Sequence, residues 1–457
     1  MNAPSSSAVP ESEADAAIYG PTFWLAYVAN VLLVCANSLT FRFAEFVAAL
    51  GGNEELSGEI IRAGLIAAIL CRLGLGRAID HYGPRLVWLM SSVVYIAAGA
   101  AFLIPDKLSY VIWLARISYS TGLAGMFSCS IVHIQNQVPA HRRTEVIGSL
   151  GSSGFVGTIL GTQLSDLAFD LLPPGTPRFV AMFGGAASMG LVHAAVVFFL
   201  TRHDVHPRPT NAPGPFRLLF RHWPGPVVLV AIAQGTSFVV TTLFLTRYAT
   251  AMRLSGIALF FLIYSLTAFA CRWIFRDWGT SFGRHQMVLW GLAGLTAGQF
   301  LFLLVTSDLL LILPGVVCGF GHALLFPAVV SIGAGRFPVK YRGSGTTLVL
   351  GFTELGTALA APLLGMLIDR GNADGGTRGF SWMFMAAGAT AGIAGVFYAA
   401  TAARHPDRDP LHAPDEGSGG SVIEAESDAG DIIAVPASES FPDGAKAFTG
   451  EEPRPSA

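Results

Sequence analysis

Three of the ionisable residues within long apolar stretches of the sequence are the first candidates for chemistry. Arg116, His322 and Glu354 each have apolar sequence on both sides. If these stretches cross a membrane, an ionisable side chain near the bilayer centre costs about 2.5–3.5 kcal/mol. We therefore expect these side chains to face the interior of a helix bundle, where a function is the default hypothesis.

Glu354 and His322 are the candidates for handling protons. Burial disfavours the charged form of a carboxylate, so a buried glutamate can load and release a proton near neutral pH. Histidine titrates in the physiological range, which would suit a proton relay. The alternatives are a hydrogen bond between packed helices for Glu354 and a fully hydrogen-bonded buried imidazole for His322.

Uncharged polar side chains form a second group of candidates. They would line a polar cavity between apolar segments, and they are Asn30, Asn37, Ser38, Gln234, Ser237, Thr241 and Thr242. Arg42 and Arg247 follow near the ends of the same two segments, in similar local sequences. We expect these two arginines to reach the lipid headgroups or to gate the mouth of the cavity.

The composition indicates that lipid surrounds these segments. Of the 457 residues, 52% are hydrophobic and 13% are charged, whereas soluble domains carry about 25% charged residues. The sequence contains no Walker loop, nucleophile elbow or paired metal ligands, so we expect no enzyme, no ATP-driven pump and no cofactor or metal site. No nucleic-acid partner is indicated. The five cysteines show no metal or disulfide spacing.

The apolar stretches predict an all-α polytopic protein with about twelve transmembrane helices, because about twenty residues span a hydrocarbon core. The expected ranges are 23–46, 57–77, 86–104, 108–133, 146–168, 179–201, 226–248, 255–275, 286–305, 309–334, 346–368 and 380–402.

The loops between these helices indicate the orientation. Basic residues such as Arg77, Arg85, Arg143 and Arg342 gather in alternate loops, and an excess of Lys and Arg marks the cytoplasmic side. We expect both termini in the cytoplasm and the protein in the inner (plasma) membrane. The expected organisation is a cytoplasmic tail (1–22), a six-helix bundle (23–202), a cytoplasmic linker (203–225), a second six-helix bundle (226–403) and a disordered acidic cytoplasmic tail (404–457).

An internal repeat with an offset of about 199–201 residues relates the two predicted bundles. It matches polar as well as apolar positions: Cys71-Arg72 with Cys271-Arg272, Gly83 with Gly283, Gly122 with Gly321, Arg143 with Arg342, Gly157 with Gly356 and Asp170 with Asp369. Two parallel six-helix repeats with a site between them are an architecture of secondary transporters. In this repeat Glu354 corresponds to Phe155, so the shared scaffold does not require the carboxylate.

The loop between the second and third predicted helices resembles the signature loop of the major facilitator superfamily. It keeps Gly76, Asp80, Gly83 and Arg85 at the expected spacing, and it has His81 and Pro84 where bases are usual. The resemblance extends over nearly all of 23–402 and implies that family's fold of two pseudo-symmetric six-helix bundles.

The resemblance also implies roles for several residues. Asp80 would brace the first bundle against the start of the eleventh helix, near 343–345, when the cytoplasmic side is closed, because a helix N-terminus carries partial positive charge. The corresponding loop of the second half has Arg276 and Thr280 in place of the Gly and Asp, which leaves a second brace open. Arg116 would lie on a cavity-lining helix and hold an anionic substrate or interact with a titrating carboxylate. A structural salt bridge or backbone contact is the alternative for Arg116.

These observations together predict a secondary transporter of a small solute that works by alternating access, most simply proton-coupled export. The helix of residues 146–168 ends its stripe of small residues in Gly161-Thr162, whereas related drug and proton antiporters have Gly-Pro there. Two alternatives therefore remain. One is uptake of a small organic anion, and the other is a non-transporting receptor or assembly factor with the same fold. The expected partners are a small-molecule substrate, protons and the lipid bilayer, and the protein is expected to be monomeric.

Overall fold

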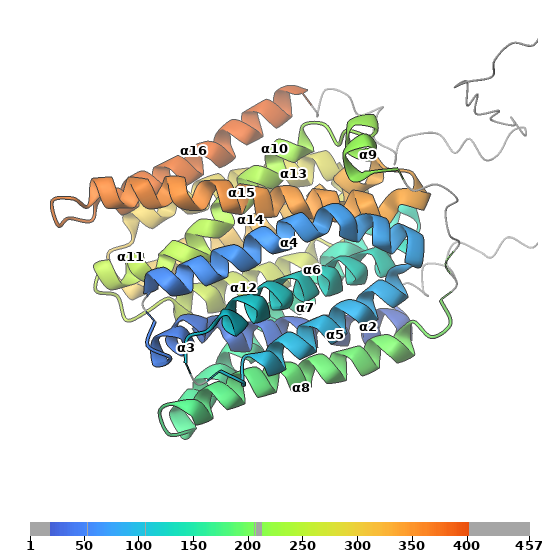
Figure 1. Cartoon of the computed structure of the whole chain (residues 1–457). Coiled ribbons are helices and arrows are strands. Elements are labelled where there is room, and N and C mark those ends of the chain that lie inside the picture. Colours follow the sequence, from blue (N-terminus) through green and yellow to red (C-terminus); the bar gives the residue numbers. More distant parts are fainter. Residues whose placement is uncertain (1–18, 53, 106, 205, 207–212, 402–457) are drawn as a thin grey trace, which may run out of the picture. The chain divides into compact units, whose positions relative to one another are not determined.

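The computed structural model describes residues 19–401 except 53, 106, 205 and 207–212 (Figure 1). The predicted tail 404–457, most of the tail 1–22 and part of the linker 203–225 lie outside the described residues. The described residues form helices and turns, and no strand occurs among them.

The first half of the described chain contains six long helical segments. The first runs from α2 (Pro21–Leu39) through a 3-10 turn (Thr40–Arg42) into α3 (Phe43–Ala49). The others are α4 (Glu54–Tyr82), α5 (Pro84–Ala101), α6 (Tyr110–Asn136), α7 (Arg143–Leu171) and α8 (Thr176–Leu200). A short helix, α9 (Pro215–Arg221), lies in the predicted linker.

The second half, within the same described ranges, contains six more. The first runs from α10 (Val227–Val239) through a π-helical turn (Val240–Phe244) into α11 (Leu245–Ala251). The others are α12 (Ala258–Ile274), α13 (Arg284–Leu301), α14 (Ile312–Gly335), α15 (Arg342–Gly371) and α16 (Arg378–Thr401). The segment of α13 begins with a π-helical turn (Gly279–Gly283), and that of α14 begins with a 3-10 turn (Asp308–Leu311).

Eight of the described helical segments are long and apolar enough to cross a membrane, and α12 is a shorter apolar helix. The remaining long helices, α4, α6 and α7, carry more polar residues. Many polar side chains of α6 and α7 are buried against other helices, where lipid does not reach them.

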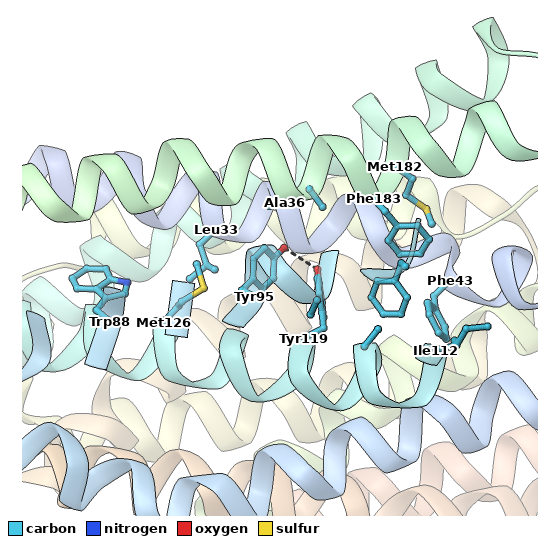
Figure 2. Close-up of a cluster of buried hydrophobic side chains, with 14 of the residues drawn as sticks. Leu33, Ala36, Phe43, Trp88, Tyr95, Ile112, Tyr119, Met126, Met182 and Phe183 are labelled. Atoms are coloured by element: carbon cyan, nitrogen blue, oxygen red, sulfur yellow. Dashed lines mark hydrogen bonds between the residues drawn. The ribbon is translucent and has the colours of Figure 1, made fainter. Parts of the chain in front are cut away.

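Each half has its own apolar core. The core of the first half joins α2, α3, α5, α6 and α8 around Trp88, Tyr95 and Phe183, which are fully buried. Figure 2 shows the hydrogen bond between Tyr95 and Tyr119, 2.9 Å long, which satisfies two hydroxyls within this core. Two clusters centred on Val288 and Phe302 form the core of the second half.

Glycines at repeat-related positions pack their helices in the same way in both halves. A Cβ on Gly122 of α6 would lie 2.9 Å from the backbone oxygen of Ser91, and a Cβ on Gly321 of α14 would lie 2.8 Å from that of Gly291. Only glycine allows these backbones to approach so closely. The two bundles therefore share backbone contacts, which an accidental sequence match would not produce.

The loops that carry the signature residues also match. Gly83 has φ 85° and Gly283 has φ 88°, a left-handed conformation that glycine adopts without steric cost. Gly83 separates α4 from α5, and Gly283 is the last residue of the π-helical turn before α13, so each glycine directly precedes the third long helix of its half.

The halves meet along α4 with α15 and along α12 with α7, two pairs that the repeat relates to each other, and also where α6 contacts α15 and α14 contacts α7. Figure 1 shows α4 (blue) running beside α15 (orange). These two interfaces position the residues discussed below.

Candidate functional site

Asp80 joins the two halves at the end of α4. Its carboxylate accepts hydrogen bonds from the backbone N–H groups of Gly343 (2.7 Å) and Ser344 (3.0 Å) and from the Ser344 hydroxyl (2.5 Å). These donors lie in the first turn of α15, where the helix dipole also favours a negative charge. Asp80 is only 4% exposed, so little water competes for these bonds. We call this end of the bundles the Asp80 end.

Gly76 allows α4 and α15 to approach at this contact. A Cβ at Gly76 would lie 2.5 Å from the Ser344 Cα and would overlap the Thr347 hydroxyl. On the other side, a Cβ at Gly343 would lie 2.6 Å from the Asp80 carboxylate. Neither position has room for a larger residue in this conformation.

Gly83 and Arg85 act within the first half. The His206 ring donates a 2.6 Å hydrogen bond to the Asp80 backbone oxygen and packs against Gly83. Arg85 donates a 2.9 Å hydrogen bond to the Arg202 backbone oxygen, and its guanidinium lies 5.6 Å from the Phe198 ring centre. The signature loop is therefore tied to the chain that leaves α8.

Glu354 lies two turns further along the same interface, where it pairs with Arg72 of α4. Arg72 Nε donates a hydrogen bond to one Glu354 carboxylate oxygen (2.7 Å), and Nη2 donates one to the other oxygen (2.5 Å). Nη1 donates a third hydrogen bond to the Ser128 hydroxyl (2.7 Å). The Arg72 side chain is 5% exposed and that of Glu354 is 24% exposed. A two-point bond of this kind fixes geometry as well as charge.

Arg272 is the repeat counterpart of Arg72, and its surroundings differ. Where Arg72 meets Glu354, Arg272 of α12 meets Phe155 of α7, with 4.8 Å between its guanidinium carbon and the ring centre. The guanidinium also lies 5.5 Å from the ring centre of Phe326. The repeat thus places a carboxylate against one arginine and an aromatic ring against the other.

Sequence reasoning used Arg72 and Arg272 as markers of the repeat and did not propose them as functional residues. The missed signal is that both arginines fall inside predicted transmembrane helices, 57–77 and 255–275. The cost of an arginine inside a bilayer already marks both as candidates.

Arg116 lies within the first half and does not contact Glu354. Its guanidinium carbon is 4.9 Å from the Phe43 ring centre and 5.7 Å from that of Tyr119. It has no ion pair among the described residues, and its buried Nε has no hydrogen-bond partner there. The structure gives Arg116 aromatic neighbours in place of the carboxylate that sequence reasoning considered.

His322, Gln234 and Thr241 come together at a small cavity in the second half, between α10, α12, α13 and α14. His322 contacts the rings of Phe155, Phe238, Tyr264 and Phe326. In the part of the chain that the structure describes, no hydrogen bond satisfies its imidazole. Buried polar atoms of Gln234, Ser237 and Gln299 beside it are also unpartnered.

Asn30 and Asn37 lie in the first half, away from this cavity. Asn30 donates a 2.6 Å hydrogen bond to Ser153 of α7, and the Asn37 side-chain oxygen accepts a 3.4 Å bond from Tyr119. Both side chains hold α2 against its own bundle. The predicted pathway residues therefore form separate groups in this conformation.

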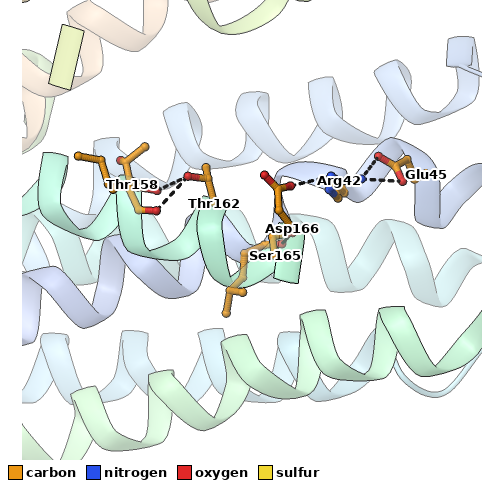
Figure 3. A network of polar contacts seen from close by, with 8 residues as sticks. Arg42, Glu45, Thr158, Thr162, Ser165 and Asp166 are labelled. Carbon is orange, nitrogen blue, oxygen red and sulfur yellow. Dashed lines mark hydrogen bonds and ion pairs between the residues drawn. The ribbon is translucent and has the colours of Figure 1, made fainter. Parts of the chain in front are cut away.

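Arg42 and Arg247 form ion pairs within their own halves, at the end opposite Asp80. Figure 3 shows Arg42 between Asp166 and Glu45, at 2.6 Å and 3.1 Å. Arg247 lies 3.7 Å from Asp369. These exposed pairs join the 3-10 turn after α2 to α7, and α11 to α15.

The second-half loop makes a different contact from the Asp80 brace. Gly279 packs against Thr144 at the start of α7, and the Thr144 hydroxyl donates a 2.8 Å hydrogen bond to Ser331. Across the described ranges, no group of three or more His, Cys, Asp or Glu side chains is placed to hold a metal ion.

Comparison with known proteins identifies the family. The model of the Major Facilitator Superfamily matches residues 18–280 and 257–441. The MFS-type transporter YhhS of Escherichia coli K12 is 22% identical over 382 residues, which cover 79% of this chain and 90% of YhhS.

Two solved structures are similar in fold. The proton:xylose symporter XylE superimposes with a TM-score of 0.67 at 15% identity, covering 85% of this chain and 96% of XylE. The human organic anion transporter MFSD10 superimposes with a TM-score of 0.67 at 16% identity, covering 86% of this chain and 100% of MFSD10. The chain therefore belongs to the major facilitator superfamily and is a multi-pass membrane transporter with that family's two-bundle fold.

Proposed function

We propose that this transporter moves a small solute by alternating access and couples the movement to protons through Glu354. The observation that carries the proposal is the Arg72–Glu354 ion pair. It joins the two halves, it lies on the same helix interface as the Asp80 brace, and the repeat counterpart of Glu354 is Phe155. A carboxylate that the scaffold does not need, placed where the halves separate, suits a coupling role.

The chemistry follows from the charge. A proton on Glu354 removes its negative charge and weakens both hydrogen bonds from Arg72. The α4–α15 interface then loses one of its two polar contacts, and separation of the halves at the Asp80 end becomes easier. Release of the proton restores the pair and favours closure.

The orientation and localisation are part of the same proposal. Arg77, Arg85, Arg143 and Arg342 gather at the Asp80 end, which places this end in the cytoplasm by the positive-inside tendency. The conformation described here would then be closed to the cytoplasm. We propose a monomer in the plasma membrane with both termini in the cytoplasm.

Export by exchange for protons is our first prediction for the direction. Uptake of a small organic anion is the second, and Arg272, a buried arginine with no carboxylate partner among the described residues, favours it. The fold neighbours include a proton:xylose symporter and an organic anion transporter by their titles, so likeness of fold supports transport of a small solute in either direction.

The experiment uses the full chain in lipid vesicles that enclose a pH-sensitive dye. Solutes from a broad panel, including sugars, organic acids and amphiphilic cations, are added outside, and proton movement and solute movement are recorded together. Protons that move against the solute support exchange, and protons that move with it support symport. Glu354→Gln should abolish the proton movement and retain solute binding.

The matched control is Glu45→Gln, which removes an exposed carboxylate that pairs with Arg42 outside the α4–α15 interface. This variant should keep coupled proton movement. Coupled flux that survives in Glu354→Gln contradicts the role of Glu354. A chain that carries no solute of the panel under any gradient would favour a receptor or assembly factor.

A further inference from the structure

Arg272 is a buried cation at the interface between the two halves. It is 5% exposed, and its Nη1 lies so close to Gly151 of α7 that a Cβ there would overlap it. The rings of Phe155 and Phe326 flank the guanidinium at 4.8 Å and 5.5 Å. It therefore touches α7 of the first half as well as α14 of its own half.

The guanidinium has no counter-charge among the described residues. It makes no ion pair and no hydrogen bond to them, and its Nε is buried without a partner. The repeat-related Arg72, by contrast, has both Glu354 and Ser128. Burying an ion without a partner is costly, and cation–π contacts offset only part of that cost. No described residue thus neutralises the positive charge of the Arg272 guanidinium.

Polar groups that could recognise the rest of a ligand lie next to His322, which shares two aromatic neighbours with Arg272. His322 contacts the same two rings, Phe155 and Phe326, and opens onto the small cavity of the second half. Unpartnered atoms of Gln234, Ser237 and Gln299 are buried there. Aromatic faces therefore flank the positive charge of Arg272, and unpartnered hydrogen-bonding groups lie on the neighbouring cavity at His322.

We propose that Arg272 binds the carboxylate of the transported solute, which makes the substrate class small organic anions. This inference rests on the proposed transport function. A guanidinium fork matches a planar carboxylate at two points, and a solute with one negative charge neutralises the site. Because Arg272 touches both halves, a solute bound there contacts both bundles, as alternating access requires.

The test measures ligand binding to the purified full chain by thermal unfolding, followed through reaction of its buried cysteines with a thiol-reactive dye. The probes are benzoate, hexanoate and lactate, each paired with its neutral amide, and inorganic phosphate. At least one carboxylate should raise Tm, and its amide should not. Arg272→Gln should weaken carboxylate binding roughly ten- to hundredfold, because hydrogen bonds to charged groups contribute about 1.5–3 kcal/mol. Arg272→Lys should retain part of the binding.

A measurement without ligand separates this role from a structural one. Arg272→Gln should leave the Tm of the free protein unchanged or raise it, because it removes an unpaired buried charge, whereas a structural clamp would lose several degrees. Arg72→Gln, which breaks a formed ion pair, should lower Tm and serves as the contrast.

The outcomes distinguish this proposal from the coupling proposal. Carboxylate binding that is kept in Glu354→Gln and lost in Arg272→Gln supports the site. No Tm shift with any carboxylate, equal shifts with the amides, a shift with phosphate alone, or loss of binding in Arg116→Gln but not in Arg272→Gln overturns it. Proton-coupled flux of neutral solutes alone would keep the coupling proposal and reject this one. Carboxylate binding at Arg272 without any flux would keep the anion site but reject both the coupling proposal and the assignment of the bound carboxylate as a transported substrate.

Discussion

Two repeat-related arginines, Arg72 and Arg272, show how single residues break the symmetry of the molecule. Both are almost fully buried, at 4% and 5% exposure, and both lie where one half meets the other. Only Arg72 has a carboxylate opposite it. The difference of one side chain, Glu354 against Phe155, leaves one arginine satisfied by the protein and the other available to a ligand.

The Arg72–Glu354 pair should show strong energetic coupling. We expect Arg72→Gln and Glu354→Gln each to lower the free energy of unfolding, with the double variant less stable than wild type by less than the sum of the two. The expected coupling is about 1–3 kcal/mol, as found for residues that share one network. Thermal or denaturant unfolding of all four proteins gives the coupling energy. Strictly additive effects would show that the pair contributes nothing to the folded state.

Asp80→Asn should shift the molecule away from the closed conformation. The amide keeps a hydrogen-bond acceptor for α15 but loses the charge, at a cost of about 1–2 kcal/mol. That cost shifts a two-state population roughly five- to thirtyfold. Spin labels at Tyr82 and Val339, both exposed at the Asp80 end, should report a larger fraction of long distances. Asp374→Asn, at an exposed loop position, is the control, and an identical distance distribution in Asp80→Asn and wild type would contradict the brace.

At the level of elements, the α4–α15 interface is built from positions that face one way on each helix. Arg72, Gly76 and Asp80 repeat every four residues on α4, so they form one stripe. The residues of α15 that contact this stripe are Ser344, Thr347 and Glu354. The central contact is close packing at Gly76, and the two ends are polar contacts. The polar contacts at the two ends can break and re-form, and Leu73 of α4 packs beside them against Phe337 and Leu348.

Gly76→Ala should disfavour the closed conformation, whereas Gly74→Ala on the same helix should not. The new methyl at residue 76 would overlap Thr347, and overpacking of this kind costs about 1–3 kcal/mol. A Cβ at residue 74 meets nothing within 4 Å, and replacing a helical glycine by alanine gains up to about 1 kcal/mol in helix propensity. The Tyr82–Val339 spin-label distance and the Tm of both variants check this. Equal behaviour of the two variants would mean that α4 and α15 do not approach as described.

At the scale of the whole molecule, the two bundles repeat one backbone plan and differ in their polar contacts. Gly83 and Gly283 share a left-handed turn, and Gly122 and Gly321 pack onto equivalent backbone atoms. Shared backbone geometry makes the halves similar rigid bodies, and the differing side chains at their interfaces give them distinct tasks. Rocking of such bodies about a central site is the motion that this architecture allows.

The parallel arrangement of the repeats predicts which surfaces face the same compartment. Cysteines introduced at Tyr82 and Phe282, both exposed, should react with a membrane-impermeant maleimide only after the cells are permeabilised. Cysteines at Ile104 and Leu309, exposed at the other end of the bundles, should react in intact cells. Labelling of Tyr82→Cys and Phe282→Cys from opposite sides would contradict the parallel repeat. Labelling of both in intact cells would reverse the proposed orientation.

The sequence by itself determined the apolar helices and the two related bundles. The lengths of the apolar stretches and the positions of Gly and Arg are read directly from the sequence. The repeat then indicates which helices of the two halves correspond to each other. The spacing of Gly76 and Asp80 carries the resemblance to the major facilitator superfamily, and that resemblance implied a contact with residues 343–345, where the structure has the hydrogen bonds.

Only the tertiary structure decided the partners of the buried charges. Glu354 pairs with a residue 282 positions away in sequence, and Arg116 meets aromatic rings in place of a carboxylate. The helical period fixes which residues share a face of one helix, but many apolar faces are interchangeable, and which two faces meet depends on the packing of all the helices together. For the same reason the missing counter-charge of Arg272 became visible only when α12 was placed against Phe155 of α7.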